Sequence, residues 1–204
     1  MESKEILNRL DEVVPSPKCE LEYKTPYELL VAVILSAQCT DKRVNTVAGE
    51  LFKEYNTPEK MVKLSQEELE KLIHSCGFYR NKAKNILAMS RDLIEKYNGQ
   101  VPRDMESLQS LAGVGRKTAN VVIGEAFGGD AIAVDTHVLR VSNRLGLANT
   151  NNPYKCEQEL MNKFDKSCWS KFHLQMVLFG RYFCKAQKPK CEDCPFKNDC
   201  KYYK

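Results

Sequence analysis

Lys117 and Asp135 lie 18 residues apart in the stretch LAGVGRKTANVVIGEAFGGDAIAVDTHVLR (111–140), and both are of residue types that catalyse reactions. Lys117 falls on the first turn of an expected helix, where the helix dipole disfavours a further cation. An unprotonated lysine amine is a nucleophile that forms Schiff bases. Asp135 begins another expected helix, and a fixed carboxylate there could stabilise a developing cation or transfer protons. Each residue also has a non-catalytic interpretation. Lys117, beside Arg116, could contact phosphate. Asp135 could be an ordinary N-cap.

A Gly-Val-Gly turn precedes the helix that carries Lys117. Glycines adopt backbone conformations that residues with a Cβ resist, and they let another backbone approach closely. The unpaired N–H groups of such a turn, and of the helical turn after it, attract phosphate without reading any base. A plain connection between two helices is the alternative that the glycines alone leave open. The candidate contacts to a nucleic-acid backbone are Gly113, Val114, Gly115 and Arg116.

Four of the nine cysteines fall within the last 21 residues, with the spacing Cys184-x6-Cys191-x2-Cys194-x5-Cys200. Four thiolates can bind zinc or an iron–sulfur cluster. Structural zinc sites usually have two closely spaced pairs, and only Cys191 and Cys194 form such a pair here, so the spacing favours a cluster. Disulfides are disfavoured in a reducing compartment. The lysines between these cysteines would give the loop a cationic surface that suits phosphates.

The composition is ordinary for a globular protein. The chain has 204 residues, of which 43% are hydrophobic and 28% charged, and its net charge of +4 is a weak indication of an anionic partner. The N-terminal segment MESKEILNRLDEVV has no apolar signal core, and the longest apolar run, around LLVAVILSAQ (29–38), is too short to span a membrane. We therefore expect a cytoplasmic protein without a membrane partner.

Helix signals dominate the chain, and few runs alternate with the period of a strand. Thr25 and Glu28 predict a capping box, and Ser65 and Glu68 predict a second one in a helix that Gly77 would end. The chain is therefore predicted to be all-α.

In the second half of the chain, glycines mark the expected end of one helix and an expected hinge. Asp135 is expected to cap the helix THVLRVSNRLG, which Gly146 would end. The segment FGGDA (127–131) is the best candidate for a hinge between two helical blocks.

Together these residues give the chain a resemblance to the endonuclease III family, of the helix–hairpin–helix DNA glycosylase superfamily. The family's segments appear here as ILSAQCTD (34–41), GFYRNKA (77–83), LAGVGRKTANVV (111–122), AVDTH (133–137) and the ending GRYFC with its further cysteines (180–200). The similarity extends over essentially the whole chain. The chain departs from the family at Ala112, where proline is frequent, at Cys39, where the best-known members have alanine, and at Phe78, where many have leucine.

The resemblance implies two helical domains with a DNA-binding cleft between them, a helix–hairpin–helix motif and a C-terminal iron–sulfur cluster loop. Residues 22–130 would form a six-helix domain with the motif, and residues 1–21 plus 131–204 would form the iron–sulfur cluster domain. The resemblance also implies a [4Fe-4S] cluster, with the ligands Cys184, Cys191, Cys194 and Cys200.

The resemblance further implies a bifunctional DNA glycosylase and apurinic/apyrimidinic lyase. Such an enzyme removes oxidised pyrimidines from duplex DNA and nicks the strand by β-elimination in base excision repair. Lys117 would be the nucleophile and Asp135 its carboxylate partner. Gln38 and Phe78 stand where the family inserts residues into the gap left by a flipped base; the alternatives are a polar residue at a helix end and a core aromatic. His137 could contact DNA or simply pack.

The expected partner is double-stranded DNA with a damaged pyrimidine or an abasic site, bound by a monomer that associates with the nucleoid through DNA. Two other functions stay open: a monofunctional DNA glycosylase and a non-catalytic DNA-binding module. Lys117 argues against an adenine glycosylase, because those relatives lack the lysine. Lys117 and Asp135 together argue against a binding module, because phosphate binding alone does not need both.

Overall fold

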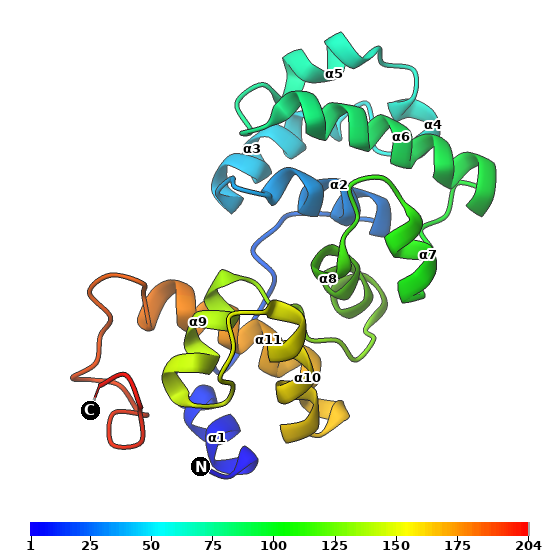
Figure 1. Ribbon diagram of the computed structural model, residues 1–204. Coiled ribbons are helices and arrows are strands. Elements are labelled where there is room, and N and C mark those ends of the chain that lie inside the picture. Colours follow the sequence, from blue (N-terminus) through cyan, green and yellow to red (C-terminus); the bar gives the residue numbers. More distant parts are fainter. Residues whose placement is uncertain (204) are drawn as a thin grey trace. The chain divides into compact units, whose positions relative to one another are not determined.

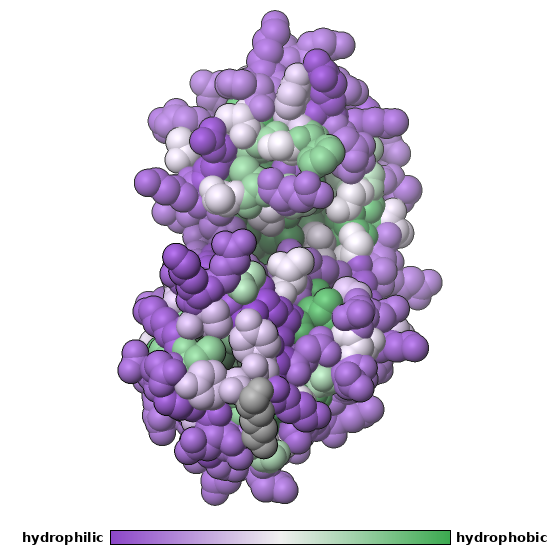
Figure 2. All heavy atoms as spheres, turned by 60° about the vertical axis from the view of Figure 1, so that its left-hand side comes forward, coloured by the Kyte–Doolittle hydropathy of each residue, from purple (hydrophilic) through white to green (hydrophobic). Residues whose placement is uncertain are grey.

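The computed structural model describes residues 1–203, which form helices and loops without a strand (Figure 1). The all-α prediction is confirmed. Residues Met1–Lys18 and Gly128–Lys204 make up one compact unit, here called the discontinuous unit, and Cys19–Phe127 make up the other, the continuous unit. Within residues 1–203 no helix has the length and apolar character that a bilayer crossing requires. Figure 2 shows mostly hydrophilic side chains on the visible face, with smaller hydrophobic areas between them.

The continuous unit is built around a central helix, α2. Nine consecutive residues of α2, Tyr27 to Leu35, are buried, and α2 contacts α3, α6 and α8. The long helix α6 packs against α4 and α5, and α7 packs against α8. The helices of this unit are α2 (Pro26–Ser36), α3 (Asp41–Leu51), α4 (Pro58–Met61), α5 (Gln66–Ile73), α6 (Tyr79–Tyr97), α7 (Met105–Ser110) and α8 (Arg116–Phe127).

The two predicted capping boxes differ in how they close. Ser65 and Glu68 form the full box, because each side chain accepts the backbone N–H of the other residue. Thr25 accepts the N–H of Glu28 at 3.1 Å, but the Glu28 carboxylate accepts the N–H of Lys24 at 2.6 Å, one residue before the cap. The box at Thr25 is therefore closed through the backbone N–H of Lys24, one residue before the predicted Thr25.

The helix α5 ends earlier than the sequence predicts. Its last residue is Ile73, and the Cys76 N–H then bonds to the Ile73 carbonyl at 2.9 Å in a tighter turn. Gly77, which was expected to end the helix, follows this turn and does not have a positive φ. The helix therefore ends through a short turn, without a left-handed glycine.

In the turn between α7 and α8, the two glycines have different roles. Gly113 has a φ of +77°, and a Cβ added to it would lie 2.9 Å from the Cβ of Asn85. Gly115 has no atom within 4 Å of an added Cβ and no positive φ, so nothing within the chain requires a glycine there. Val114 between them is buried and packs into the core of the continuous unit. Only the first glycine is needed for the turn itself.

The discontinuous unit joins the N-terminal helix to the second half of the chain. The helix α1 contacts α11, and α9 contacts α10, α11 and η2. The Ser3 hydroxyl donates to the Lys163 carbonyl at 2.6 Å, and the Arg9 guanidinium donates to the Pro195 carbonyl at 3.0 Å. The elements of this unit are α1 (Ser3–Val13), α9 (Thr136–Leu145), α10 (Pro153–Lys163), the 3-10 helix η1 (Lys166–Cys168), α11 (Trp169–Leu178) and the π-helix η2 (Phe179–Phe183).

The turn before α8 gives a first testable prediction. We expect Gly113→Ala to lower the free energy of unfolding by about 1–3 kcal/mol, because it places a Cβ in a left-handed conformation and against Asn85. Gly115→Ala serves as the matched control and should change this free energy by no more than about 0.5 kcal/mol. Urea denaturation of the two variants beside the parent protein checks this. Equal losses in both variants would contradict it.

Candidate active site and iron–sulfur centre

Lys117 is the second residue of α8 and is exposed to solvent. The helix is anchored by Ala119, Asn120 and Val122, which are buried. The predicted position on the first helical turn is correct, and the side chain is not covered by the unit that carries it. An amine at this place can approach a bound molecule without displacing any core residue.

Asp135 is the N-cap of α9, as the sequence predicts. Its Oδ1 accepts the backbone N–H groups of His137 and Val138, both at 2.8 Å. The half-buried side chain follows a buried run, Ala131–Val134, which fixes the backbone on its N-terminal side. Both capping bonds fall on one oxygen, so the second oxygen, Oδ2, stays outside the cap. The two interpretations of Asp135 are therefore compatible, since capping orients the carboxylate and leaves one oxygen for chemistry.

His137 packs within the discontinuous unit. A Cβ on Gly180 would lie 2.9 Å from the His137 Cβ, so α9 and η2 approach each other as closely as a glycine permits. The His137 Nδ1 lies 3.3 Å from a guanidinium nitrogen of Arg140. Because a guanidinium only donates, Nδ1 accepts and Nε2 carries the ring proton. His137 therefore packs against η2, and a DNA contact by its ring stays a prediction.

Gln38 and Phe78 lie on two loops that touch each other. A Cβ on Gly77 would lie 3.5 Å from the Gln38 carbonyl oxygen. Both residues are in the left-handed region, with φ of 53° for Gln38 and 58° for Phe78. Phe78 is 66% exposed, so it is not a core aromatic, and Gln38 is also exposed. Left-handed backbone costs a residue with a Cβ about 1–3 kcal/mol, and such strain concentrates at functional sites.

Arg140 is a residue that sequence reasoning missed. Its guanidinium donates to the Gly180 carbonyl at 2.7 Å and to the Cys184 carbonyl at 3.2 Å. Burial, and then the positive charge of Arg144, lower the pKa of Arg140. Arg140 ties the helix that begins at Asp135 to the start of the cysteine loop. Its four-residue spacing from Arg144, which places both on one helix face, is the only signal that could have found it.

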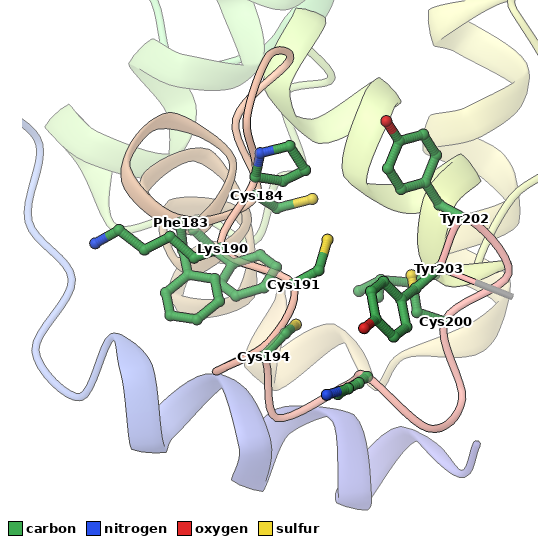
Figure 3. A pocket seen from close by; sticks show the side chains of 12 residues that line it. Phe183, Cys184, Lys190, Cys191, Cys194, Cys200, Tyr202 and Tyr203 are labelled. Atoms are coloured by element: carbon green, nitrogen blue, oxygen red, sulfur yellow. The ribbon is translucent and has the colours of Figure 1, made fainter.

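The four C-terminal cysteines line a single pocket. Figure 3 shows Cys184, Cys191, Cys194 and Cys200 around one space, with Phe183 on one side and Tyr202 and Tyr203 on the other. Leu145 and Phe179 add apolar walls. Four soft thiolate ligands with apolar side chains around them suit an iron–sulfur cluster. The donor set therefore fits the predicted cofactor.

Arg144 holds the first part of this loop. Its Nη1 donates to the Lys185 carbonyl at 2.7 Å and lies 3.4 Å from the Cys184 sulfur, and its Nη2 donates to the Ala186 carbonyl at 3.1 Å. Its guanidinium also lies 3.9 Å from the centroid of the Tyr202 ring. A positive charge beside the thiolates offsets part of the negative charge that a cluster with four thiolate ligands carries.

Comparison with known proteins decides the family. Residues 31–166 match the model of the HhH-GPD superfamily of base excision DNA repair proteins, and residues 184–200 match the iron–sulfur binding domain of endonuclease III. Endonuclease III of Bacillus subtilis (strain 168) is 50% identical over 196 residues, which cover 96% of this chain and 90% of the relative. The chain belongs to the endonuclease III family. The family prediction is confirmed, and with it the class of enzyme: a bifunctional DNA glycosylase and lyase of base excision repair that carries a [4Fe-4S] cluster.

Solved structures agree with endonuclease III membership. A trapped endonuclease III–DNA covalent intermediate has a TM-score of 0.96 and 49% identity, and the match covers 100% of this chain and 97% of that one. A thermostable thymine-DNA glycosylase has a TM-score of 0.86 at 27% identity, covering 98% and 95% of the two chains. The fold is therefore shared with a thymine-DNA glycosylase.

The contacts of Arg144 predict its effect on the iron–sulfur centre. We expect Arg144→Gln to lose the cluster about tenfold faster in the presence of a chelator, because the loop loses charge-assisted hydrogen bonds worth about 1.5–3 kcal/mol each. The decay of the cluster's visible absorption measures this rate. Lys155→Gln, an exposed change of the same charge on α10, is the control. Equal decay rates in both variants would show that Arg144 does not stabilise the loop.

Proposed function

We propose that this chain removes oxidised pyrimidines from duplex DNA with Lys117 as the nucleophile, and then cuts the strand by β-elimination. Its partner is DNA, because the chain belongs to a family of base excision DNA repair proteins. The observation that carries the proposal is the covalent DNA intermediate of the related endonuclease III, taken together with an exposed lysine at the start of α8. A covalent intermediate requires a nucleophile that DNA can reach, and Lys117 meets this requirement.

The reaction follows from the chemistry of an amine and a sugar. A damaged pyrimidine is stacked or paired poorly, so moving it out of the helix costs less than moving a normal base. The Lys117 Nζ attacks C1′, the bond to the base breaks, and the base leaves with the electron pair and takes up a proton. The Nζ then loses a proton, the C1′–O4′ bond breaks as O4′ takes up a proton, and the opened sugar is held as a protonated Schiff base. Its iminium acidifies the C2′ protons. Loss of one C2′ proton expels the 3′ phosphate and nicks the strand.

Asp135 would stabilise the positive charge that develops on the sugar and assist in proton transfer. The cap supports this role, because Oδ1 is held by two N–H donors and the carboxylate cannot rotate without breaking them. Lys117 belongs to the continuous unit and Asp135 to the discontinuous unit. We propose that these two units are the two predicted domains, and that both act on the bound DNA.

The remaining site residues would position DNA. The turn from Gly113 to Arg116 would hold a phosphate, and open space at Gly115 supports the close approach of a second backbone. Gln38 would pair with the base left without a partner, and Phe78 would enter the stack. His137 would donate from Nε2. We also propose a monomer in the cytoplasm, associated with the nucleoid, and the cluster ligands Cys184, Cys191, Cys194 and Cys200.

Trapping the Schiff base tests the nucleophile directly. We expect the cluster-loaded protein, incubated with a duplex containing an oxidised pyrimidine and then with borohydride, to form a covalent protein–DNA adduct. Lys117→Gln should form no adduct and should release base at least about 10³-fold more slowly, because the reaction loses its nucleophile. Lys63→Gln, an exposed lysine of the same unit, should keep both activities.

Two other outcomes would exclude this mechanism. Base release by the parent protein without any adduct indicates a monofunctional glycosylase. DNA binding without an adduct or base release, over several lesions and with the cluster loaded, indicates a binding module.

Substitutions of Asp135 separate capping from chemistry. Asn caps a helix as well as Asp does, whereas Ala at an N-cap costs about 1 kcal/mol. We expect Asp135→Asn to keep the parent's unfolding free energy within about 0.5 kcal/mol and yet lose base release by about 10²-fold or more. Asp135→Ala should lose both stability and activity. Thermal unfolding and single-turnover kinetics measure the two effects, and an active Asp135→Asn would leave Asp135 as a cap alone.

A further inference from the structure

Lys82 is a lysine in the core of the continuous unit. It lies on the first turn of α6 and is only 5% exposed. Its Nζ donates to the Leu35 carbonyl at 2.8 Å, and within the described residues 1–203 it has no carboxylate partner. Lysine is almost never fully buried unless it is paired, and burial lowers the pKa of Lys82. The position therefore needs a reason beyond packing.

The Leu35 carbonyl explains part of this choice. Leu35 is the second-last residue of α2, and the last four carbonyls of a helix have no partner within the helix. Because Leu35 is fully buried, its carbonyl needs a partner from the protein, and a cation beside a helix C-terminus is favourable. Lys82 thus supplies a hydrogen bond to the buried end of α2.

Lys82 also bonds to the loop in front of its own helix. Its backbone N–H donates to the Phe78 carbonyl at 3.1 Å. At the end of α2, the Cys39 N–H donates to the Ser36 carbonyl at 3.1 Å, which closes the turn that contains Gln38. The carbonyl that Nζ contacts lies three residues before Gln38. One residue therefore joins the start of the Gln38 turn to the backbone of Phe78.

The two loops need such a connection because both carry strained backbone. Gln38 and Phe78 have φ of 53° and 58°, a conformation that persists in residues with a Cβ only where the surroundings fix it. The loops also touch directly, since a Cβ on Gly77 would lie 3.5 Å from the Gln38 carbonyl oxygen. With α2 and α6 tied through Lys82, the separation of the two exposed side chains is set from inside the core.

We propose that Lys82 is a positioning residue for recognition of the undamaged strand: it sets the separation of Gln38 from Phe78, and with it the preference for the base opposite the lesion. The inference rests on the proposed function, which places these two side chains in the gap left by the flipped base. It extends that function to a buried residue.

Hydrogen-bond geometry explains why a small displacement matters. The Gln38 amide has both donors and an acceptor, so it can pair with the edge of any base, and each base offers a different arrangement. Hydrogen bonds weaken steeply when their angle departs from the optimum. A displacement of about 1 Å at a positioning residue can cost about 10²-fold. The base that suits the amide best therefore changes when the loop shifts.

Binding to an uncleavable substrate tests the inference without requiring catalysis. The cluster-loaded protein is titrated with duplexes that carry a tetrahydrofuran abasic analogue opposite each of the four bases. The measured quantity is the spread, defined as the ratio of the weakest to the tightest dissociation constant. We expect Lys82→Met, which keeps the apolar stem but loses the donor, to reduce the spread at least about fivefold. The effect should vanish for a duplex with the analogue in both strands, because no base is then left for Gln38.

Further variants separate positioning from folding. Partial unfolding lowers the active fraction and leaves the spread unchanged. Lys84→Met, an exposed change of the same kind on α6, should keep the parent's spread. Should Lys82→Met fail to fold, Lys82→Arg keeps the charge and carries a larger head that must shift the end of α2. It should change the spread at least about threefold.

A double-mutant cycle with Gln38→Ala identifies the route. Lys82→Met should cause no further change of the spread in the Gln38→Ala background, and an effect that persists there in full would overturn the link to Gln38. An equal spread for the parent and a folded Lys82 variant, or equal affinity of the parent for all four bases, would overturn the inference.

Borohydride trapping of the parent, run in parallel, tests the proposed function separately. A missing adduct contradicts the lyase mechanism alone, because the binding spread does not depend on it. An adduct together with an unchanged spread contradicts only the role of Lys82.

Discussion

The pair of hydrogen bonds that Asp135 accepts is the constraint on which the discontinuous unit depends. They begin α9 at a fixed residue and hold the carboxylate in one orientation. From this start, the helix places Arg140 and Arg144 four residues apart, where both guanidiniums bind carbonyl groups of the cysteine loop. The same helix thereby connects the capping carboxylate of Asp135 to the cysteine loop, so a shift of its first turn would also displace the contacts of that loop.

The continuous unit is subject to a different constraint, namely backbone strain in two of its loops. Its central helix is buried on nearly all sides, and the loop that follows it carries Gln38 in a left-handed conformation next to the equally strained Phe78. Glycine would relieve the strain at either position but would remove the side chain. The exposed Phe78 ring is also an unfavourable group to leave in water. A DNA stack that accepts the ring would account for both costs.

Local hydrogen bonding could be predicted from the sequence, whereas packing between distant segments could not. Ser65 and Asp135 cap their helices as predicted because capping depends on residues two or three positions away. The sequence did not show that Gly115 and Gly77 lack a positive φ, because the backbone conformation of a glycine depends on its neighbours in the fold. The missed contacts of Arg140 with Gly180 and Cys184 join segments about 40 residues apart. The roles of Lys117 and Asp135 were inferred from family resemblance and stay predictions.

The order of the two units along the chain has a consequence for biosynthesis. The continuous unit, Cys19–Phe127, has all its partners within one stretch and can fold as soon as that stretch leaves the ribosome. The helix α1 cannot complete its contacts this early, because Arg9 donates to the carbonyl of Pro195. Its apolar face packs against α11 and can be covered there only after residues 169–178 have been translated. The N-terminal helix and the cysteine loop can therefore join only after Pro195 has been translated.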